Sequence, residues 1–312
     1  MNYSKKIVIP GGSGFLGMSL ARFFERQGYS VIVLSRKAKK SEGNVSFIQW
    51  DGKLLGPWAD EFENASAIIN MAGRTVDCRY TEANKAQILN SRLDSTKIIG
   101  EAIQKCQNPP KVWLNSSSAT IYEGSRDKMQ DEETGTIGND FSMNVCKEWE
   151  QMFFSSELPQ TRRVALRTSI VLGKGGGAMQ PLLNLAKVGL GGTQGDGGQF
   201  FSWLHIKDFV KIVNWLIEHE QIEGVVNCVA PNPVTNKELM QILRKSVGMP
   251  LGLPLANWML KLGAMLIQTE TELILKSRKV YPKRLVEEGY FFQYTLLEDA
   301  IAEIVGTEWG TA

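Results

Sequence analysis

The chain has 312 residues, a formal net charge of +2, a hydrophobic fraction of 43% and a charged fraction of 22%. These values are typical of a globular protein with a sizeable core and argue against a disordered or fibrous chain. The nearly balanced charge, with one short basic cluster at Arg36–Lys40, argues against a nucleic-acid partner.

The first predicted strand, Lys6–Pro10, runs into a glycine-rich turn and then into an amphipathic helix. Glycine permits the tight turn and a close approach of pyrophosphate, while free backbone N–H groups and the helix dipole attract its negative charge. A merely tight turn between strand and helix is the alternative interpretation. The order of strand, turn and helix favours a dinucleotide site made by Gly11, Ser13, Gly14, Phe15, Leu16 and Gly17.

The second predicted strand, Ser30–Leu34, is followed by Ser35, Arg36 and Lys37. Many NAD sites place an acidic residue here to bind the ribose hydroxyl, and an acid would repel the 2′-phosphate of NADP(H). Arginine offers a phosphate a planar fork of donors, and serine offers a hydroxyl. These three residues therefore favour NADP(H) over NAD(H), the alternative being a solvated basic turn.

The later strands of the first half alternate with helical spacing, which is the pattern of βαβ units and a parallel sheet. They are predicted over Val45–Gln49, Ala67–Met71, Val112–Ser116 and Val164–Leu172. We therefore expect an α/β fold in which residues 1–172 form a Rossmann-type, doubly wound parallel sheet.

Residues 173–312 are expected to form a smaller C-terminal α/β lobe on the substrate side. Its glycine-rich start, 173–199, has a backbone that is able to approach a ligand closely, so we place a functional cleft there. A short strand near 225–229 belongs either to this lobe or to the first sheet. Helices are predicted over Asn236–Val247, Asn257–Ile267 and Leu296–Ile304. The most apolar stretch, 255–268, is too short and too interrupted to span a membrane, so no membrane partner is expected.

Three motifs resemble the extended, epimerase-like branch of the short-chain dehydrogenase/reductase superfamily. They are the glycine spacing G-x-x-G-x-x-G, the turn Asn70-Met71-Ala72-Gly73 and the serine-rich run Ser116–Tyr122. The resemblance implies that the turn lines the cofactor, that an acid after the third strand meets the adenine amino group, and that one helix position faces the cofactor. The residues at these positions are Asp51, Ala72, Gly73 and Arg92.

The same resemblance implies a catalytic serine, tyrosine and lysine. Ser118 matches the serine that hydrogen-bonds a substrate carbonyl or hydroxyl. A Tyr-x-x-x-Lys pair would follow on a helix, where the lysine lowers the tyrosine pKa and the tyrosine transfers a proton. Here Lys147 is present but Met143 occupies the tyrosine position, and a thioether donates no proton. Tyr122 is one substitute; the alternatives are a non-catalytic role for Tyr122 and a surface role for Lys147.

The block before a long predicted helix also resembles the family, in which His205 and Asp208 have packing and capping duties. Sugar-nucleotide epimerases commonly carry an arginine in this block that grips the substrate diphosphate, and Phe201 occupies that position here. A smaller or more apolar substrate is therefore expected. Phe200, Phe201 and Trp203 either line its pocket or pack in the interior.

Almost the whole chain resembles one atypical subgroup, the nucleoside-diphosphate-sugar epimerase-like proteins with an extra C-terminal domain of unknown function. The resemblance implies an NADP(H)-dependent oxidoreductase or epimerase-like enzyme that acts on an unidentified small molecule by hydride transfer. The alternative, motivated by Met143, is a dinucleotide-binding sensor or interaction protein that has lost turnover. The predicted helices Tyr80–Lys105 and Phe141–Ser156 either pair in a homodimer or cover the sheet of their own chain.

The content of cysteine and histidine indicates the compartment. The cysteines form no Cys-x-x-Cys pair, and the chain has 2 histidines. This pattern argues against a disulfide framework, a zinc site and a histidine-rich metal site. The first residues enter a strand without the apolar stretch of a signal peptide. We therefore expect a cytoplasmic protein without a bound metal.

Overall fold

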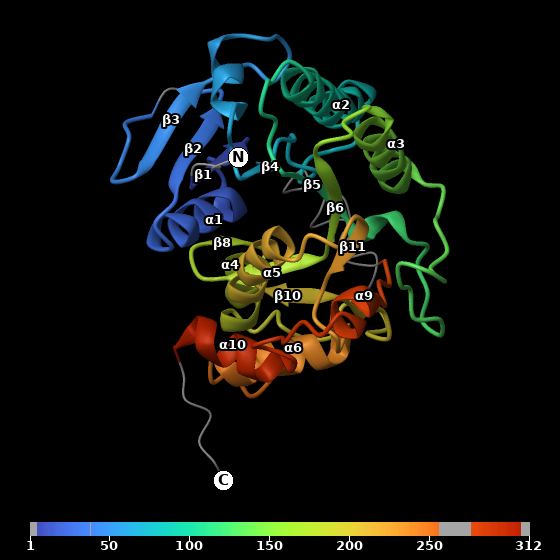
Figure 1. Ribbon diagram of the computed structural model, residues 1–312. Coiled ribbons are helices and arrows are strands. Elements are labelled where there is room, and N and C mark those ends of the chain that lie inside the picture. The colour runs from blue at the N-terminus through green and yellow to red at the C-terminus, as the bar shows by residue number, and fades with distance from the viewer. Residues whose placement is uncertain (1–4, 38, 256–275, 307–312) are drawn as a thin grey trace.

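A computed structural model of the chain describes residues 5–37, 39–255 and 276–306. Its centre is a seven-stranded parallel sheet with the strand order β11-β6-β5-β4-β1-β2-β3 (Figure 1). The expected Rossmann-type α/β fold is confirmed. The predicted helix Asn257–Ile267 lies outside the described residues.

Helices cover both faces of this sheet. Helices α1 (Phe15–Arg26) and α5 (Ile206–Glu218) pack on one face, and α2 (Glu82–Gln104) and α3 (Phe141–Ser155) pack on the other (Figure 1). The inner strands are largely buried and rich in valine, isoleucine and leucine, as expected where helices cover a parallel sheet on both sides. They are β1 (Lys6–Pro10), β2 (Ser30–Ser35), β3 (Val45–Gln49), β4 (Ala67–Asn70), β5 (Val112–Ser118), β6 (Arg162–Thr168) and β11 (Gly224–Cys228).

The run predicted as one strand over Val164–Leu172 is divided in two. Strand β6 ends at Thr168 in the main sheet, where β11 pairs with its outer edge. After Ser169 the chain enters β7 (Ile170–Gly173), which belongs to a three-stranded sheet with the order β10-β7-β8. One predicted strand therefore serves two sheets, and the polar residues Arg167, Thr168 and Ser169 lie at the division between them.

A second group of helices packs around the smaller sheet. Helices α4 (Met179–Lys187), α6 (Asn236–Ser246) and α10 (Leu297–Val305) share a hydrophobic core with β7 and β10. The short elements are η1 (Pro57–Phe62), η2 (Ala119–Ile121), β8 (Gly176–Gly177), β9 (Phe200–Phe201), β10 (Trp203–His205), β12 (Val234–Thr235) and α9 (Lys283–Glu287). Within the described ranges, no helix combines the length and the hydropathy needed to cross a membrane.

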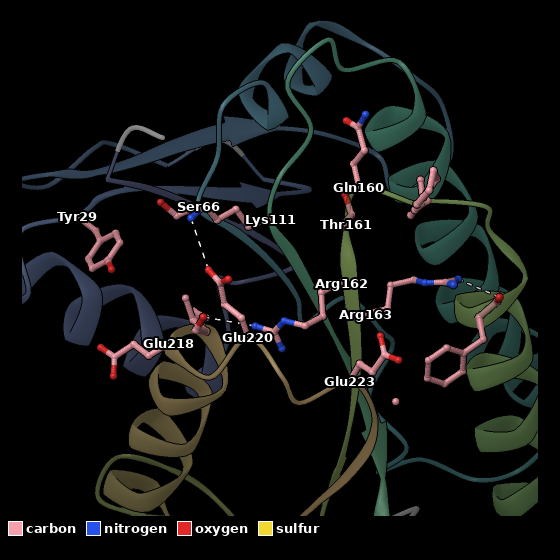
Figure 2. Close-up of a pocket in the computed structure, with 15 residues that line it drawn as sticks. Tyr29, Ser66, Lys111, Gln160, Thr161, Arg162, Arg163, Glu218, Glu220 and Glu223 are labelled. Atoms are coloured by element: carbon pink, nitrogen blue, oxygen red, sulfur yellow. Dashed lines mark hydrogen bonds and ion pairs between the residues drawn. The ribbon is translucent and has the colours of Figure 1, made fainter. Parts of the chain in front are cut away.

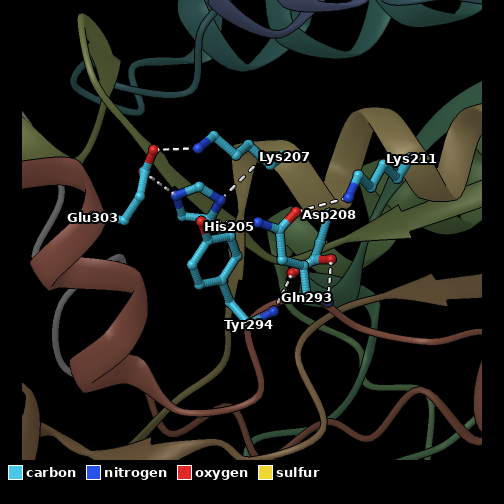
Figure 3. A network of polar contacts seen from close by, with 7 residues as sticks. All are labelled: His205, Lys207, Asp208, Lys211, Gln293, Tyr294 and Glu303. Carbon is cyan, nitrogen blue, oxygen red and sulfur yellow. Dashed lines mark hydrogen bonds and ion pairs between the residues drawn. The ribbon is translucent and has the colours of Figure 1, made fainter.

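A polar network around the buried side chains of His205 and Asp208 joins α10 to the start of α5 (Figure 3). The His205 ring accepts a hydrogen bond from the backbone N–H of Lys207 at Nδ1, and its Nε2 lies 2.9 Å from Glu303 on α10. The Asp208 carboxylate accepts hydrogen bonds from the two backbone N–H groups of Gln293–Tyr294. The first turn of α5 is thereby capped and tied to the chain that leads into α10.

This network predicts a loss of stability in acid. Burial lowers the pKa of His205 to about 4 from the ordinary 6.5, although the Glu303 carboxylate acts in the opposite direction. Between pH 4 and pH 6.5 the unfolded chain binds more protons than the folded one. The stability that neutral, buried His205 contributes is therefore complete above pH 6.5 and is lost as the pH falls toward 4. The expected loss in the free energy of unfolding is on the order of 3 kcal/mol. We expect His205→Asn, which keeps a capping side chain, to flatten the pH dependence of the urea midpoint below neutrality. An unaltered pH dependence would contradict this assignment.

Candidate functional site

A cavity of about 350 Å³ lies at the carboxyl ends of β1, β2 and β4. In an open parallel sheet, the crevice beyond the carboxyl ends of the strands is the usual position of a ligand. The walls come from the turns after these strands, from the chain after β3 and from one face of α2. They consist of Gly11, Ser13, Gly14, Ser35, Arg36, Trp50, Asp51, Gly52, Lys53, Met71, Ala72, Gly73, Arg74, Ser91, Asp94 and Ser95.

The turn after β1 accepts glycine alone at two points. Gly11 has a φ of +69°, and a Cβ there would lie 2.5 Å from the Cα of Ala72. A Cβ on Gly17 would lie 2.3 Å from the Cα of Gly12, so α1 begins directly against the turn. The N-cap of α1 is Gly14, which offers the first N–H groups no side-chain acceptor. These N–H groups and the helix dipole form a site suited to a phosphate anion.

The structure gathers most of the predicted cofactor residues around this cavity but leaves five outside its lining. Phe15 packs against the glycine segment, since a Cβ on Gly176 would lie 2.4 Å from its ring. Leu16 packs against the core, Gly17 lies behind the turn, and Lys37 is exposed beside the cavity. Those that line the cavity are Gly11, Ser13, Gly14, Ser35, Arg36, Asp51, Ala72 and Gly73.

Arg92, the fifth residue, supports the wall from behind. Its Nη1 donates hydrogen bonds to the carbonyl oxygens of Arg74 and Ile88, and its guanidinium lies 5.0 Å from the centre of the Trp149 ring. A Cβ on Gly73 would lie 3.3 Å from the Arg92 guanidinium carbon. Sequence reasoning missed Arg74, which lines the cavity itself; its position directly after the Ala72–Gly73 turn was the available signal.

Charged groups of both signs surround the mouth of the cavity. Arg36 is exposed there, at the end of β2. The Asp51 carboxylate accepts hydrogen bonds from the backbone N–H groups of Lys53 and Leu54 at 2.8 and 2.9 Å. The bonds from Leu54 and Lys53 hold the pKa of Asp51 below its usual range. Asp51 is therefore ionised and fixed in orientation at neutral pH.

The predicted catalytic residues Ser118 and Lys147 lie near the carboxyl end of β5 and on α3. The Ser118 hydroxyl caps η2 by accepting the backbone N–H of Thr120. Helix α3 packs against η2. Lys147 Nζ donates to the side-chain oxygen of Asn139 at 2.5 Å, just before α3 begins. Met143, one turn from Lys147, is buried, with an exposed fraction of 3%.

The structure does not bring Tyr122 to the cavity. Its side chain is buried, and its hydroxyl accepts a hydrogen bond from Arg167 at 2.8 Å and donates one to Asn227 at 3.0 Å. Arg167 is in turn paired with the Glu150 carboxylate through two hydrogen bonds. Desolvation raises the pKa of Tyr122 despite the charge of Arg167. A buried phenol held in this way is a structural link between β6, α3 and β11.

The aromatic residues before α5 divide between two environments. Phe200 and Phe201 line a small recess together with Lys276 and Arg278. Trp203 is fully buried and donates its indole N–H to the carbonyl of Asn232. Of the two alternatives for these aromatics, interior packing therefore applies to Trp203 and pocket lining to the two phenylalanines.

A larger hollow, about 1290 Å³, lies at the opposite edge of the main sheet, among the amino ends of its strands (Figure 2). Arg162 Nη2 donates to the last carbonyl groups of α5 at Leu216, and Arg163 Nη1 donates to Phe154 and Ser156 at the end of α3. These guanidinium groups serve helix ends. The hollow lies at the edge of the sheet opposite the glycine turn, and its arginines have structural partners, so we do not assign the functional site to it.

Comparison with known proteins agrees with this geometry. The family model described as "NAD dependent epimerase/dehydratase family" matches residues 7–228, and a domain of unknown function, DUF1731, matches residues 256–304. The chain belongs to the NAD dependent epimerase/dehydratase family.

Relatives of this family member match it along nearly the whole chain. The human epimerase family protein SDR39U1 is 32% identical over 96% of this chain and 99% of its own, and YfhF of Bacillus subtilis (strain 168) is 33% identical over 96% and 97%. The crystal structure of human SDR39U1 (isoform2) with NADPH superposes with a TM-score of 0.84, at 32% identity over 96% of this chain and 99% of that chain.

The residues of this epimerase-family chain fit a dinucleotide. Gly11 lies against Ala72 and Gly17 lies against Gly12 without room for a Cβ, so strand, turn and helix pack as closely as a backbone cradle for pyrophosphate requires. The cavity next to the cradle has room for a nucleoside between the turns that follow β2 and β3.

Proposed function

We propose that this protein binds NADP(H) and transfers a hydride between the nicotinamide and a small carbonyl or hydroxyl compound. The observation that carries the proposal is that the glycine turn and Arg36 line one cavity at the carboxyl edge of the sheet. The human relative crystallised with NADPH supports the choice of nucleotide.

Each part of the cofactor has a chemically suited partner. The N–H groups at the start of α1 would bind the pyrophosphate, and Asp51 would accept hydrogen bonds from the adenine amino group. Arg36 and the Ser35 hydroxyl would meet the 2′-phosphate, for which an arginine fork is a strong partner. Lys37 is exposed next to them and adds positive charge at the mouth.

The reaction needs a site for the substrate beside the nicotinamide, which supplies or accepts the hydride when the cofactor is bound. Ser118 would hydrogen-bond the reacting oxygen, and Lys147 would hold the nicotinamide ribose. Phe200 and Phe201 would favour a substrate smaller and more apolar than a sugar nucleotide. A cofactor-binding sensor without turnover is the second candidate, favoured by the buried thioether of Met143.

The first test is a titration of the protein with NADPH and NADH, followed by energy transfer from tryptophan. Arg36→Ala removes a charge-assisted contact worth about 1.5 to 3 kcal/mol, so NADPH binding is expected to weaken roughly 10- to 100-fold. NADH has no 2′-phosphate, and its affinity should change little.

Lys40→Ala is the matched control, because it removes one exposed positive charge from the same basic cluster without touching the cavity lining. It should leave both affinities near the wild-type values. Equal losses for the two nucleotides in Arg36→Ala would contradict the phosphate role. Failure of the wild-type protein to bind either nucleotide would overturn the proposed function.

A further inference from the structure

The chain from Lys276 to Tyr281 is held between two parts of the epimerase-family region. On one side, the Arg278 N–H donates to the Phe200 carbonyl at 2.8 Å, and the Ser202 hydroxyl donates to the Arg278 carbonyl at 2.8 Å. On the other side, the Ser277 hydroxyl donates to the Ser125 carbonyl at 2.7 Å. The backbone position of Lys276 is therefore fixed by its neighbours in the chain.

The Lys276 side chain extends from this segment to the first turn of α3. Its ammonium forms an ion pair with Asp140, the N-cap residue of α3, and lies 3.9 Å from the sulfur of Met143. A Cβ on Gly124 would lie 3.5 Å from Lys276 Cγ, so the aliphatic stem passes over the loop after η2. The ammonium therefore stands beside the residue in the tyrosine position.

This ammonium borders open space as well as protein. Lys276 lines both the recess that contains Phe200 and Phe201 and a wider hollow, about 540 Å³, that contains Asn139, Asp140 and Met143. The wider hollow is bounded by the loop that follows β5 and η2, at the same edge of the sheet as the nucleotide cavity. Consecutive residues before α3 hold two lysines: Asn139 accepts from Lys147 and Asp140 pairs with Lys276.

The surroundings favour a lysine that exchanges protons near neutral pH. Desolvation, followed by the positive charge of Arg278, lowers the pKa of Lys276 to about 8. The Asp140 carboxylate acts in the opposite direction by stabilising the ammonium, and Glu123 and Arg126 line the same hollow. A group that releases and regains a proton near the working pH is suited to general acid–base catalysis.

We propose that Lys276, from the C-terminal segment, is the catalytic residue that donates or accepts the proton at the reacting oxygen. This role rests on the proposed function. When a carbonyl is reduced, its carbon gains the hydride, its oxygen takes one proton from the Lys276 ammonium, and the product is an alcohol. The neutral amine left on Lys276 regains its proton from water. In the oxidation of an alcohol the amine takes the hydroxyl proton, so Asp140 orients a group that alternates between charged and neutral forms.

The test is competitive acylation of lysines with acetic anhydride across a pH series, read residue by residue by mass spectrometry. Lys276 is expected to titrate near pH 8. Saturating NADP⁺, verified by tryptophan fluorescence, should slow its labelling several-fold, because the bound cofactor would shield this side chain from the reagent. Asp140→Asn keeps the helix cap and should shift the titration to lower pH. Lys279, on the same segment, donates to the carbonyl groups of Arg126 and Asp127, and NADP⁺ should not change its labelling rate.

A second measurement compares the rate of NADPH oxidation with 9,10-phenanthrenequinone as the carbonyl probe. Lys276→Met should be slower by about 100-fold or more, as expected for loss of a general acid, with NADPH affinity unchanged. Lys279→Met should keep the wild-type rate. Lys276→Arg should fail to restore the rate, because arginine does not release its proton.

Any one of several results would overturn the proposal. One is that Lys276 is labelled at every pH like an ordinary surface lysine, or that bound NADP⁺ does not change its labelling rate. Another is equal rates for the wild type and Lys276→Met, which would leave the ion pair with Asp140 a purely structural contact. The last is a wild type that binds NADPH but reduces no probe, which removes the catalytic half of the proposed function and leaves its binding half standing. Absence of NADP(H) binding would overturn both proposals together.

Discussion

Arg167→Met is expected to lower the free energy of unfolding by about 3 to 5 kcal/mol, the usual cost of removing one partner from a buried ion pair. Arg167 and Glu150 are both 8% exposed, and their side chains share hydrogen bonds of 2.8 and 2.7 Å. Without the guanidinium, the Glu150 carboxylate keeps the hydroxyl of Ser117 but loses its counter-charge. Urea unfolding followed by tryptophan fluorescence and circular dichroism would measure the loss.

Two controls separate this effect from the mere loss of a surface charge. The double variant Arg167→Met, Glu150→Met leaves no unpaired buried charge and should recover much of the stability. Lys97→Met removes one member of an exposed pair with Glu101, whose atoms are 3.9 Å apart, and should cost less than about 0.5 kcal/mol. A single variant Arg167→Met that unfolds at the wild-type urea concentration would refute a stabilising role for the network.

Gly17→Ala should weaken both the fold and nucleotide binding, although alanine is the better helix former by about 1 kcal/mol. The added methyl group would lie 2.3 Å from the Cα of Gly12, which is backbone and has no rotamer to change. Helix α1 must move away from the turn, and overpacking of this kind costs about 1 to 3 kcal/mol. Moving α1 also displaces the N–H groups expected to bind pyrophosphate.

Gly14→Ala is the matched control for Gly17→Ala. Its Cβ meets nothing within 4 Å, and its φ of −90° suits any residue. Stability should therefore stay close to that of the wild type, while a methyl group at the cavity wall should still impede the nucleotide. If both variants unfolded at the same urea concentration as the wild type, the contact between Gly17 and Gly12 would not restrict the position of α1.

The parts of the site that the sequence predicts are those with a local cause. The glycine turn, the turn after β4, and Ser35 and Arg36 at the end of β2 follow directly from buried strands, and each lines the cavity. The break at Ser169 has a local signal in the polar residues Arg167 and Thr168, but nothing nearby in the sequence shows that β7 joins a different sheet. Which strand a residue pairs with is decided by tertiary packing and leaves no period in the sequence.

Contacts between residues that are far apart in the chain could not be predicted from motifs. Lys276 lies 133 positions from Met143, and no spacing connects them. Tyr122 is close to Ser118 in the chain, which makes it a candidate substitute acid, but its hydroxyl lies in the interior beside Arg167. Closeness in the chain therefore does not bring the Tyr122 hydroxyl to the cavity.

The attachment of Lys276–Tyr281 to β9 bears on how this protein can be taken apart and recombined. The span matched by the epimerase model contains the main sheet except for Lys6, yet Phe200 and Ser202 within it hydrogen-bond to Arg278 in the other matched span. A truncation between the two spans would remove the hydrogen-bonded segment that lies along one side of β9. Chimeras between relatives should therefore exchange both spans together.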